Sequence, residues 1–154
     1  MAPIHSYVNV NAALIQAGLM VLEDTVSYYI DTARTEANAV TSGGAVHVYV
    51  NLKGRESGGS VPPEDYEEVQ EEVITVLSAI TDPVDEKPVF QRILRREELG
   101  ELHLDGEDSG DVFAQARMGY YPDYHRDRTE VIQPVEFYGQ HGYDSSLPER
   151  GAAF

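Results

Sequence analysis

The sequence predicts an α/β fold, and four stretches of it carry that prediction. Residues 45–52 read AVHVYVNL, an alternating run of β-branched and aromatic side chains that is typical of a buried strand. Residues 63–80 place apolar side chains at helical spacing on one face, which indicates an amphipathic helix. Further strand-like runs follow that helix at 88–99 and 111–119. Strands that alternate with at least one well-defined helix predict an α/β or mixed domain.

The first forty residues are predicted to hold one short helix followed by strands. Residues 7–17 read as the helix, which Asn9 or Asn11 would cap at its start. Gly18 is expected to end it, because glycine readily adopts the left-handed conformation that follows a helix. Residues 19–40 are expected to form hairpin-like strand segments.

Irregular connections are predicted at 42–44, at the glycine-rich 53–63 and at the aromatic-rich 120–137. Pro63 stands where a first-turn proline is tolerated in a helix. The outer face of the predicted helix carries four glutamates, and their like-charge pairs cost about 0.3 kcal/mol each. These residues are Glu67, Glu68, Glu71 and Glu72. Residues 81–83, Thr-Asp-Pro, would end the helix.

The charge balance restricts the possible partners. The chain has 27 acidic and 11 basic residues, a formal net charge of −16. This charge argues against nucleic-acid binding and against anionic membrane surfaces as partners. Only Lys53 and Lys87 are lysines. Abundant carboxylates with little lysine fit a halophilic host, in which salt screens self-repulsion, and they also fit a mesophile with an acidic surface.

The cellular compartment is only weakly indicated. The chain has no cysteine, which excludes disulfides, thiolate metal sites and a cysteine nucleophile. No apolar run has membrane-spanning length, and the opening MAPIHSYVNVN lacks the pattern of a signal peptide. If Met1 is the authentic start, we expect a cytoplasmic protein, and otherwise the compartment is unknown.

His141 is the candidate metal ligand. Gly139 and Gly142 flank it, so the backbone there can adopt positive φ and present the imidazole, and Asp144 follows closely. Imidazole suits zinc, but a zinc site needs three or four protein ligands. No two of the five histidines stand three or four positions apart, so no self-contained helical site exists. These histidines are His5, His47, His103, His125 and His141. The alternative is an ordinary hydrogen-bonded surface histidine.

Two arginine-containing segments are weaker candidates. Arg55 follows a predicted strand within Lys-Gly-Arg-Glu and could hold an anion, but a local ion pair with Glu56 is favoured. Neither phosphate-loop spacing is present. A cluster of three arginines follows at 92–96, where pairing with Glu97 and Glu98 on a solvated face is favoured over a phosphate site.

Two further groups are expected to be structural. The acidic run 105–111 resembles a calcium loop but lacks its twelve-residue pattern, so a solvated turn is favoured. The tyrosines at 120, 121 and 124 are expected to pack within a loop rather than to stack on bases.

Three stretches, taken together, resemble one protein family. They are the strand–loop–helix block 48–83, the segment 89–99 and the ending YGQHGYDSSLPERGAAF at 138–154. They resemble the C-terminal portion of the type I phosphodiesterase/nucleotide pyrophosphatase family of the alkaline phosphatase superfamily. The Gly-x-His-Gly-Tyr-Asp ending, placed after Asn-Leu-Lys-Gly-Arg-Glu, is the most specific part.

This resemblance implies a fold and a function. It implies that residues 1–154 are the C-terminal part of an alkaline-phosphatase-like three-layer domain, with a mixed sheet and flanking helices. The family uses two metal ions, usually zinc, and His141 resembles a ligand of one of them. In the family the nucleophile and most of the other ligands lie upstream, and the last upstream piece is an Asp-His-Gly that precedes a segment like the present start. Met1 is therefore expected to be an internal methionine.

The resemblance also implies an activity and a substrate class for the parent enzyme. We expect the fragment to be inactive alone and the parent enzyme to act on a small phosphodiester or nucleotide, with no substrate-binding residue identifiable in this chain. The alternative is a stand-alone, non-catalytic protein-interaction module derived from that fold. Sheet edges exposed by missing strands would favour its self-association.

Overall fold

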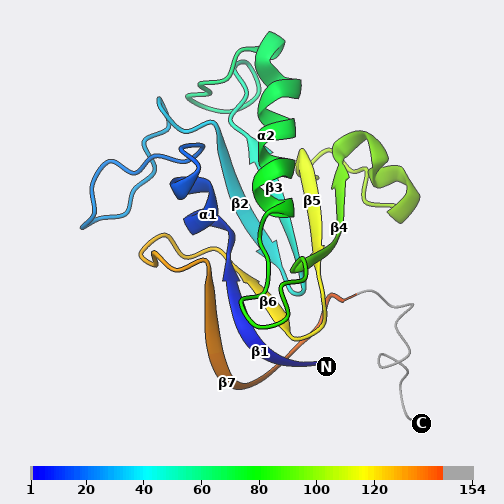
Figure 1. The fold of residues 1–154 in the computed structure, drawn as a ribbon. Helices are drawn as coiled ribbons and strands as arrows, with labels where there is room; N and C mark the ends of the chain where they lie inside the picture. The colour runs from blue at the N-terminus through cyan, green and yellow to red at the C-terminus, as the bar shows by residue number, and fades with distance from the viewer. Residues whose placement is uncertain (1, 144–154) are drawn as a thin grey trace.

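A computed structural model describes residues 2–143, and in this range seven strands form two sheets (Figure 1). One sheet has three strands in the order β6-β1-β7. Their bounds are Ala2–Asn9 for β1, Tyr120–Asp123 for β6 and Ile132–Gln140 for β7. The other has four strands in the order β2-β3-β5-β4. Their bounds are Ala37–Ser42 for β2, Ala45–Val50 for β3, Phe90–Arg95 for β4 and Val112–Ala116 for β5. The predicted α/β class is confirmed.

The four-stranded sheet is antiparallel throughout and is built on a hairpin. Gly43, with φ of +61°, turns the chain between β2 and β3, so the loop predicted at 42–44 is confirmed as a tight turn. β3 is the strand predicted at 45–52, and its Val46, Val48 and Val50 are completely buried. These valine side chains favour its position at the centre of the sheet, between β2 and β5.

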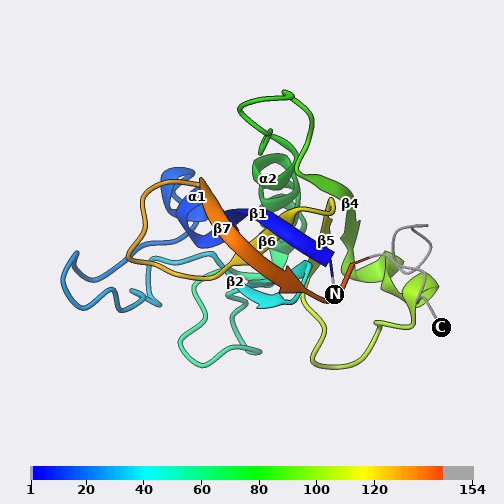
Figure 2. The same cartoon turned by 90° about the horizontal axis from the view of Figure 1, so that it is seen from below.

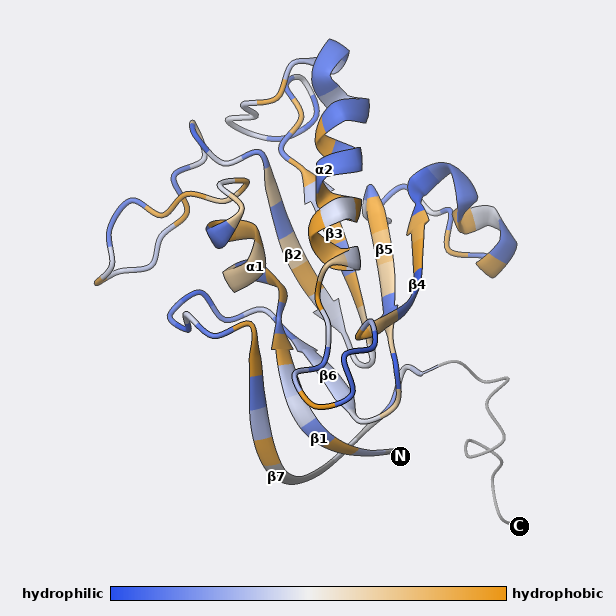
Figure 3. Ribbon diagram, in the orientation of Figure 1, coloured by the Kyte–Doolittle hydropathy of each residue, from blue (hydrophilic) through white to orange (hydrophobic). Residues whose placement is uncertain are grey.

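Helix α2 (Tyr66–Ser78) confirms the helix predicted at 63–80. A short 3₁₀ turn, Pro63–Asp65, leads into it with Pro63 at its first position. Val73 and Leu77 are completely buried against the sheet, and the helix contacts β3, β4 and β5. The four glutamates lie on the outer, exposed face. Figure 3 shows the resulting alternation of hydrophilic and hydrophobic turns along α2.

Helix α1 (Val10–Gln16) begins later than the predicted 7–17, because the preceding residues belong to β1. The side-chain oxygen of Asn9 accepts a hydrogen bond of 2.9 Å from the amide of Ala12, so the cap predicted at Asn9 is confirmed. Gly18 follows the helix with φ of +83°, as expected. α1 packs against α2 and β2, so both helices lie over the four-stranded sheet (Figure 1).

One prediction of local structure was only partly correct, and another was wrong. Within the predicted hairpin-like segments at 19–40, Leu22 and Ile30 form one antiparallel bridge and β2 begins at Ala37, but the remaining residues are irregular. Residues 120–137 were expected to be a loop, yet they contain β6 and most of β7. Both of these strands are formed by pairing with β1 more than one hundred residues earlier, which a local pattern cannot reveal.

The segment 88–99, predicted as a strand that runs into a corner of basic and acidic residues, is confirmed. β4 ends at Arg95, and the 3₁₀ helix η2 (Arg96–Leu102) follows. η2 buries Leu99 completely, in a small cluster with Ala45 and Phe113. η2 therefore contributes an apolar contact on the face of β5 opposite the main core.

One main core joins the two sheets. It includes Val8 of β1, Leu14 of α1 and Tyr120 of β6 together with the inner residues of the four-stranded sheet and of α2. A second, smaller cluster lies on the other side of β1 and contains Ile4 and Tyr143. In the described part of the chain, no helix is both long and apolar enough to cross a bilayer.

Candidate functional site

His141 lies directly beyond β7, beside the start of β1. β1 and β7 are antiparallel, and their register pairs Ala2 with Gln140. Figure 2 shows the first residues of β1 and the end of β7 side by side. The imidazole that the sequence singles out therefore lies at the N-terminal end of β1.

The segment that carries His141 is held at two points. Its carbonyl oxygen accepts a hydrogen bond of 2.8 Å from the amide of Gly44, in the turn between β2 and β3. Two residues later, Tyr143 is 4% exposed, and its hydroxyl donates to the carbonyl oxygen of Tyr120 at 2.7 Å. His141 itself is exposed. The chain thus fixes the backbone on both sides of an accessible imidazole.

The glycines beside His141 behave differently from each other. Gly142 has φ of +84°, and a Cβ there would lie 2.9 Å from the amide nitrogen of Gly44. Gly139 instead lies within β7, paired with Pro3, and does not take positive φ. One flanking glycine therefore permits the close approach that the sequence predicts, and the other continues the strand. Asp144 lies outside the described residues.

The described residues do not form a complete metal site. Between residues 2 and 143, no three His, Cys, Asp or Glu side chains converge as a metal site would require. Zinc needs three or four protein ligands, so the residues between 2 and 143 offer no complete zinc site around His141. The acidic run 105–111 does not form a calcium loop either, because the carboxylate of Asp111 is fully buried and bonded to Arg55.

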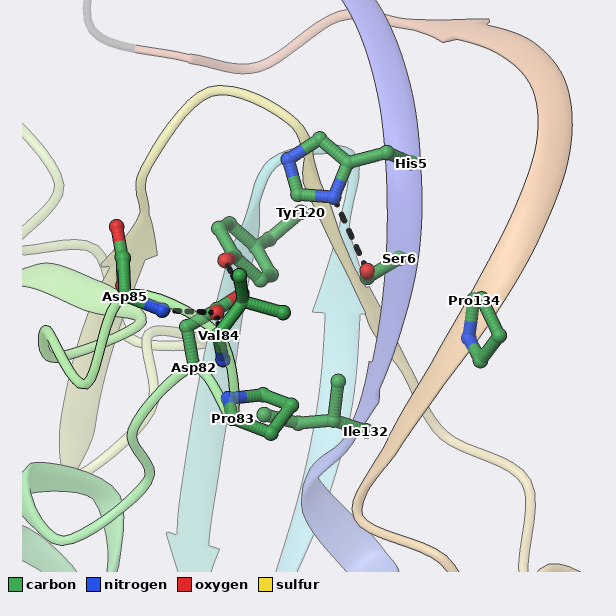
Figure 4. Close-up of a pocket in the computed structure, with 9 residues that line it drawn as sticks. All are labelled: His5, Ser6, Asp82, Pro83, Val84, Asp85, Tyr120, Ile132 and Pro134. Carbon is green, nitrogen blue, oxygen red and sulfur yellow. Dashed lines mark hydrogen bonds between the residues drawn. The ribbon is translucent and has the colours of Figure 1, made fainter.

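A cleft of about 520 Å³ opens beside the middle of β1, at His5 and Ser6 (Figure 4). β1 contributes His5 and Ser6, β6 contributes Tyr120, and β7 contributes Ile132 and Pro134. The turn between α2 and β4, residues 82–85, forms the facing wall. The cleft therefore combines an apolar side with an imidazole, two hydroxyls and two carboxylates.

The ring of His5 has a fixed orientation in this cleft. Its Nδ1 shares a hydrogen bond of 3.0 Å with the hydroxyl of Ser6, and its edge meets the Tyr120 ring at a centroid distance of 4.8 Å. A Cβ at Gly119 would overlap the His5 ring, so only glycine, with φ of +95°, fits beneath it. The amides of His5 and Ser6 both donate to the carbonyl of Gly119, where the register of β1 and β7 also shifts between Ile4 and Ser6. This irregularity is what places two consecutive polar side chains in one cleft.

The carboxylates of the cleft are already bonded. The Tyr120 hydroxyl donates to Asp82, and this bond together with two backbone amides holds the pKa of Asp82 below its usual value. Burial, followed by the bond to Asp82, raises the pKa of Tyr120. Arg117 pairs with Asp85 at 2.9 Å and lowers the pKa of that carboxyl to about 2. These groups anchor the turn at 82–85 to β6, and neither carboxylate is a free ligand.

Arg55 belongs to a structural network. It forms the predicted ion pair with Glu56 at 2.9 Å, which confirms the favoured interpretation. It also bonds both carboxylate oxygens of Asp111, at 2.8 and 2.6 Å. Tyr66 donates to the same carboxylate at 2.9 Å, and burial, followed by this negative charge, raises the pKa of Tyr66. The sequence did not predict that Asp111 is buried. It belongs to an acidic run that was expected to be a solvated turn, but its side chain is completely buried.

The arginine cluster at 92–96 also has structural partners. Arg95 pairs with Glu71 of α2, and Arg96 donates to backbone carbonyls of the 106–109 loop. The expected ion pairs between these arginine side chains and Glu97 or Glu98 were wrong. Glu98 instead accepts a hydrogen bond of 2.7 Å from the backbone amide of Arg95. Neither of these two arginines is available as an anion site.

A carboxylate–imidazole pair lies at the C-terminal end of β1, opposite to His141. Asp123, the last residue of β6, has a side chain only 3% exposed, and it bonds Nδ1 of His125. It also pairs with Arg128 at 2.7 Å. The ring of Tyr124 stacks on His125 at a centroid distance of 5.2 Å. The aromatic-rich pattern predicted only a packing loop for this segment and so missed the cluster, although Asp-x-His itself was a visible signal.

Comparison with known proteins adds no family assignment. The chain matches no protein-family model, no curated protein and no solved structure.

Proposed function

We propose that this chain is the C-terminal part of a zinc-dependent phosphodiesterase/nucleotide pyrophosphatase-like hydrolase, in which His141 is one metal ligand. The observation that supports the proposal is the pairing of Ala2 with Gln140. In a longer polypeptide, residues preceding Ala2 would emerge beside His141. The family places its Asp-His-Gly ligands in that upstream position.

The anchoring of the His141 segment agrees with this role. A ligand must be held in one place by its surroundings if it is to complete a coordination sphere. The bonds from Gly44 to His141 and from Tyr143 to Tyr120 do this for the backbone. The alkaline-phosphatase-like arrangement belongs to the same proposal and is compatible with an α/β fold that has a mixed sheet and flanking helices.

The chain alone is proposed to be inactive. In the described range it provides one imidazole where a dinuclear site needs several donors, and the proposal assigns its nucleophile to upstream sequence. When bound, the two zinc ions would activate the nucleophile and take up charge from the phosphoryl oxygens of a small phosphodiester or nucleotide.

The test extends the coding sequence upstream in frame and assays the longer protein. With bis(p-nitrophenyl) phosphate and zinc, we expect turnover that falls at least ~1,000-fold on His141→Ala, together with loss of bound zinc by elemental analysis. His125→Ala, far from this end of β1, is the matched control and should retain activity. An upstream frame without Asp and His donors, or turnover that survives His141→Ala, contradicts the proposal. So does His141-dependent turnover by the 154-residue chain alone.

The second candidate is a non-catalytic interaction module, and one feature of the fold favours it. Within residues 2–143, β7 is the longest strand, with nine residues, and it pairs only with β1. An unpaired strand edge can add a second copy of the chain. A defined dimer in light scattering, without zinc uptake by the longer protein, would favour this module over the hydrolase. A monomer at all concentrations would contradict it.

A further inference from the structure

A small cavity lies at the end of β1 that is remote from His141. It has a volume of about 240 Å³, and its lining is mostly apolar and includes Ile15 and Leu22. Tyr28, Arg126 and Arg128 are also among the residues that line it. Since seven residue steps separate Ala2 from Asn9, about 23 Å of strand lies between this end and His141. The cavity is therefore separate from the proposed zinc site.

Arg126 is the unusual member of this lining. Its side chain is half-buried, yet it forms no hydrogen bond or ion pair with any described residue. The chain carries 27 acidic residues, so carboxylate partners are plentiful. Most other arginines of the described range are paired, and Arg92, which is not, is exposed. A guanidinium held in a cavity without a protein partner is suited to an external anion.

The loop that carries Arg126 is rigidly positioned. The buried carboxylate of Asp123 accepts from the amides of Tyr124 at 2.8 Å and His125 at 3.3 Å. It also holds Arg128 on the far side of Arg126. The loop is thus tied down before and after Arg126, as a preorganised binding loop would be.

The backbone of Tyr28 supports the same conclusion. Tyr28 has φ of +54°, a left-handed conformation that is uncommon for a residue with a bulky side chain. Backbone outliers of this kind concentrate at ligand sites, where strain holds a side chain in a required place. In this loop it places Tyr28 in the wall of the cavity.

We propose that this cavity binds a small aromatic anion, with its ring on the apolar lining beside Tyr28 and its acidic group on Arg126. The volume admits one ring and one acidic group, and is below that of a drug-sized pocket. Arg128 is already paired with Asp123, and Asp127 also lines the cavity. Arg126 is therefore the group that supplies the net attraction, and a single acidic group is the matching ligand chemistry.

The test titrates the chain with phenyl phosphate in metal-free buffer containing EDTA, followed by amide NMR shifts. We expect saturable shifts at 12–16, 22–28 and 126–129 with a dissociation constant below about 10 mM. Phenol has only the aromatic ring and inorganic phosphate has only the anionic group, so each should bind at least ~10-fold more weakly than phenyl phosphate. Benzoate should compete with phenyl phosphate for the cavity. Because no zinc is present, failure of this experiment leaves the zinc proposal untouched.

Arg126→Gln is the decisive variant, and Arg92→Gln is its matched control. Arg126→Gln should weaken phenyl phosphate at least ~10-fold, whereas Arg92→Gln should change it less than ~2-fold. An unchanged amide spectrum outside the cavity shows that each variant is folded. Equal weakening by both variants, shifts located elsewhere, or no saturation at about 10 mM would overturn the proposal.

Discussion

The hydroxyl of Tyr143 donates a 2.7 Å hydrogen bond to the carbonyl oxygen of Tyr120, and this contact ties the end of the described chain to β6. It joins the segment of His141 to a residue that lines the 520 Å³ cleft. A hydrogen bond therefore connects the His141 segment, which lies beside the start of β1, to the cleft beside the middle of the same strand.

Tyr143→Phe should loosen this connection. Loss of the hydroxyl leaves the Tyr120 carbonyl without this donor, and we expect the free energy of unfolding to fall by about 1 kcal/mol. Urea denaturation measures the loss, and the amide shifts of His141 and Gly44 should move. Tyr29→Phe, at an exposed ring, is the control and should change neither. An unchanged His141 environment would show that the contact does not position the ligand.

Asp111→Asn should strongly destabilise the fold. It removes the buried carboxylate that Arg55 bonds and leaves that guanidinium only the carboxylate of Glu56, in a site where the Asp111 side chain is completely buried and the Arg55 side chain is 36% exposed. Because the pair is only partly buried, we expect the free energy of unfolding to fall by about 2 kcal/mol, less than for a fully buried pair. Asp108→Asn, three positions earlier and exposed, should cost less than ~0.5 kcal/mol. Similar denaturation midpoints for the two variants would contradict the structural role of the network.

A comparison of Gly119→Ala with Gly18→Ala separates the cost of backbone strain from the cost of overlap with a neighbouring side chain. Gly18 and Gly119 both have positive φ, but a Cβ at Gly18 meets no atom within 4 Å, whereas one at Gly119 overlaps His5. Gly18→Ala should therefore cost about 1 kcal/mol for the conformation alone, and Gly119→Ala should cost clearly more. Thermal unfolding of both proteins measures the difference. Equal losses would mean that the His5 ring is free to move away.

His47 should make stability depend on pH below its ordinary pKa of 6.5. Burial lowers the pKa of His47 below its ordinary value of 6.5, and its Nδ1 accepts a hydrogen bond of 3.1 Å from the amide of Gly110. The unfolded chain therefore binds the proton more readily than the folded chain. This contribution to stability is complete above the ordinary pKa of 6.5 and declines as pH falls toward the folded pKa.

An NMR titration of the imidazole protons tests this directly. The His47 midpoint should lie below 6.5, and urea midpoints should decrease from about pH 7 to about pH 5 by less in His47→Gln than in the parent chain. A His47 midpoint at or above 6.5 would be inconsistent with the burial and with the bond from Gly110.

Sequence patterns were reliable where one element's own residues carry the structural information. α2 follows from its apolar spacing and β3 from its alternating valines, and Asn9, one of the two predicted caps, caps α1, although the helix was predicted to begin at residue 7. Such patterns failed for β6 and β7, because both owe their strand conformation to β1. They also failed for Asp111 and Asp123, which look like solvated acids in the sequence and are buried in the fold.

The sequence by itself determined the α/β class, the positions of the main helix and the central strand, the acidic composition and the choice of His141 as the candidate ligand. Only the tertiary structure decided that His141 lies beside the start of β1, that Asp111 and Asp123 are buried, and that Arg126 lines a cavity with no partner among the described residues. The physical reason is the distance along the chain over which each interaction acts. Helical periodicity, caps and turns act over a few residues, whereas burial and charge pairing depend on contacts between segments that the chain brings together only when it folds.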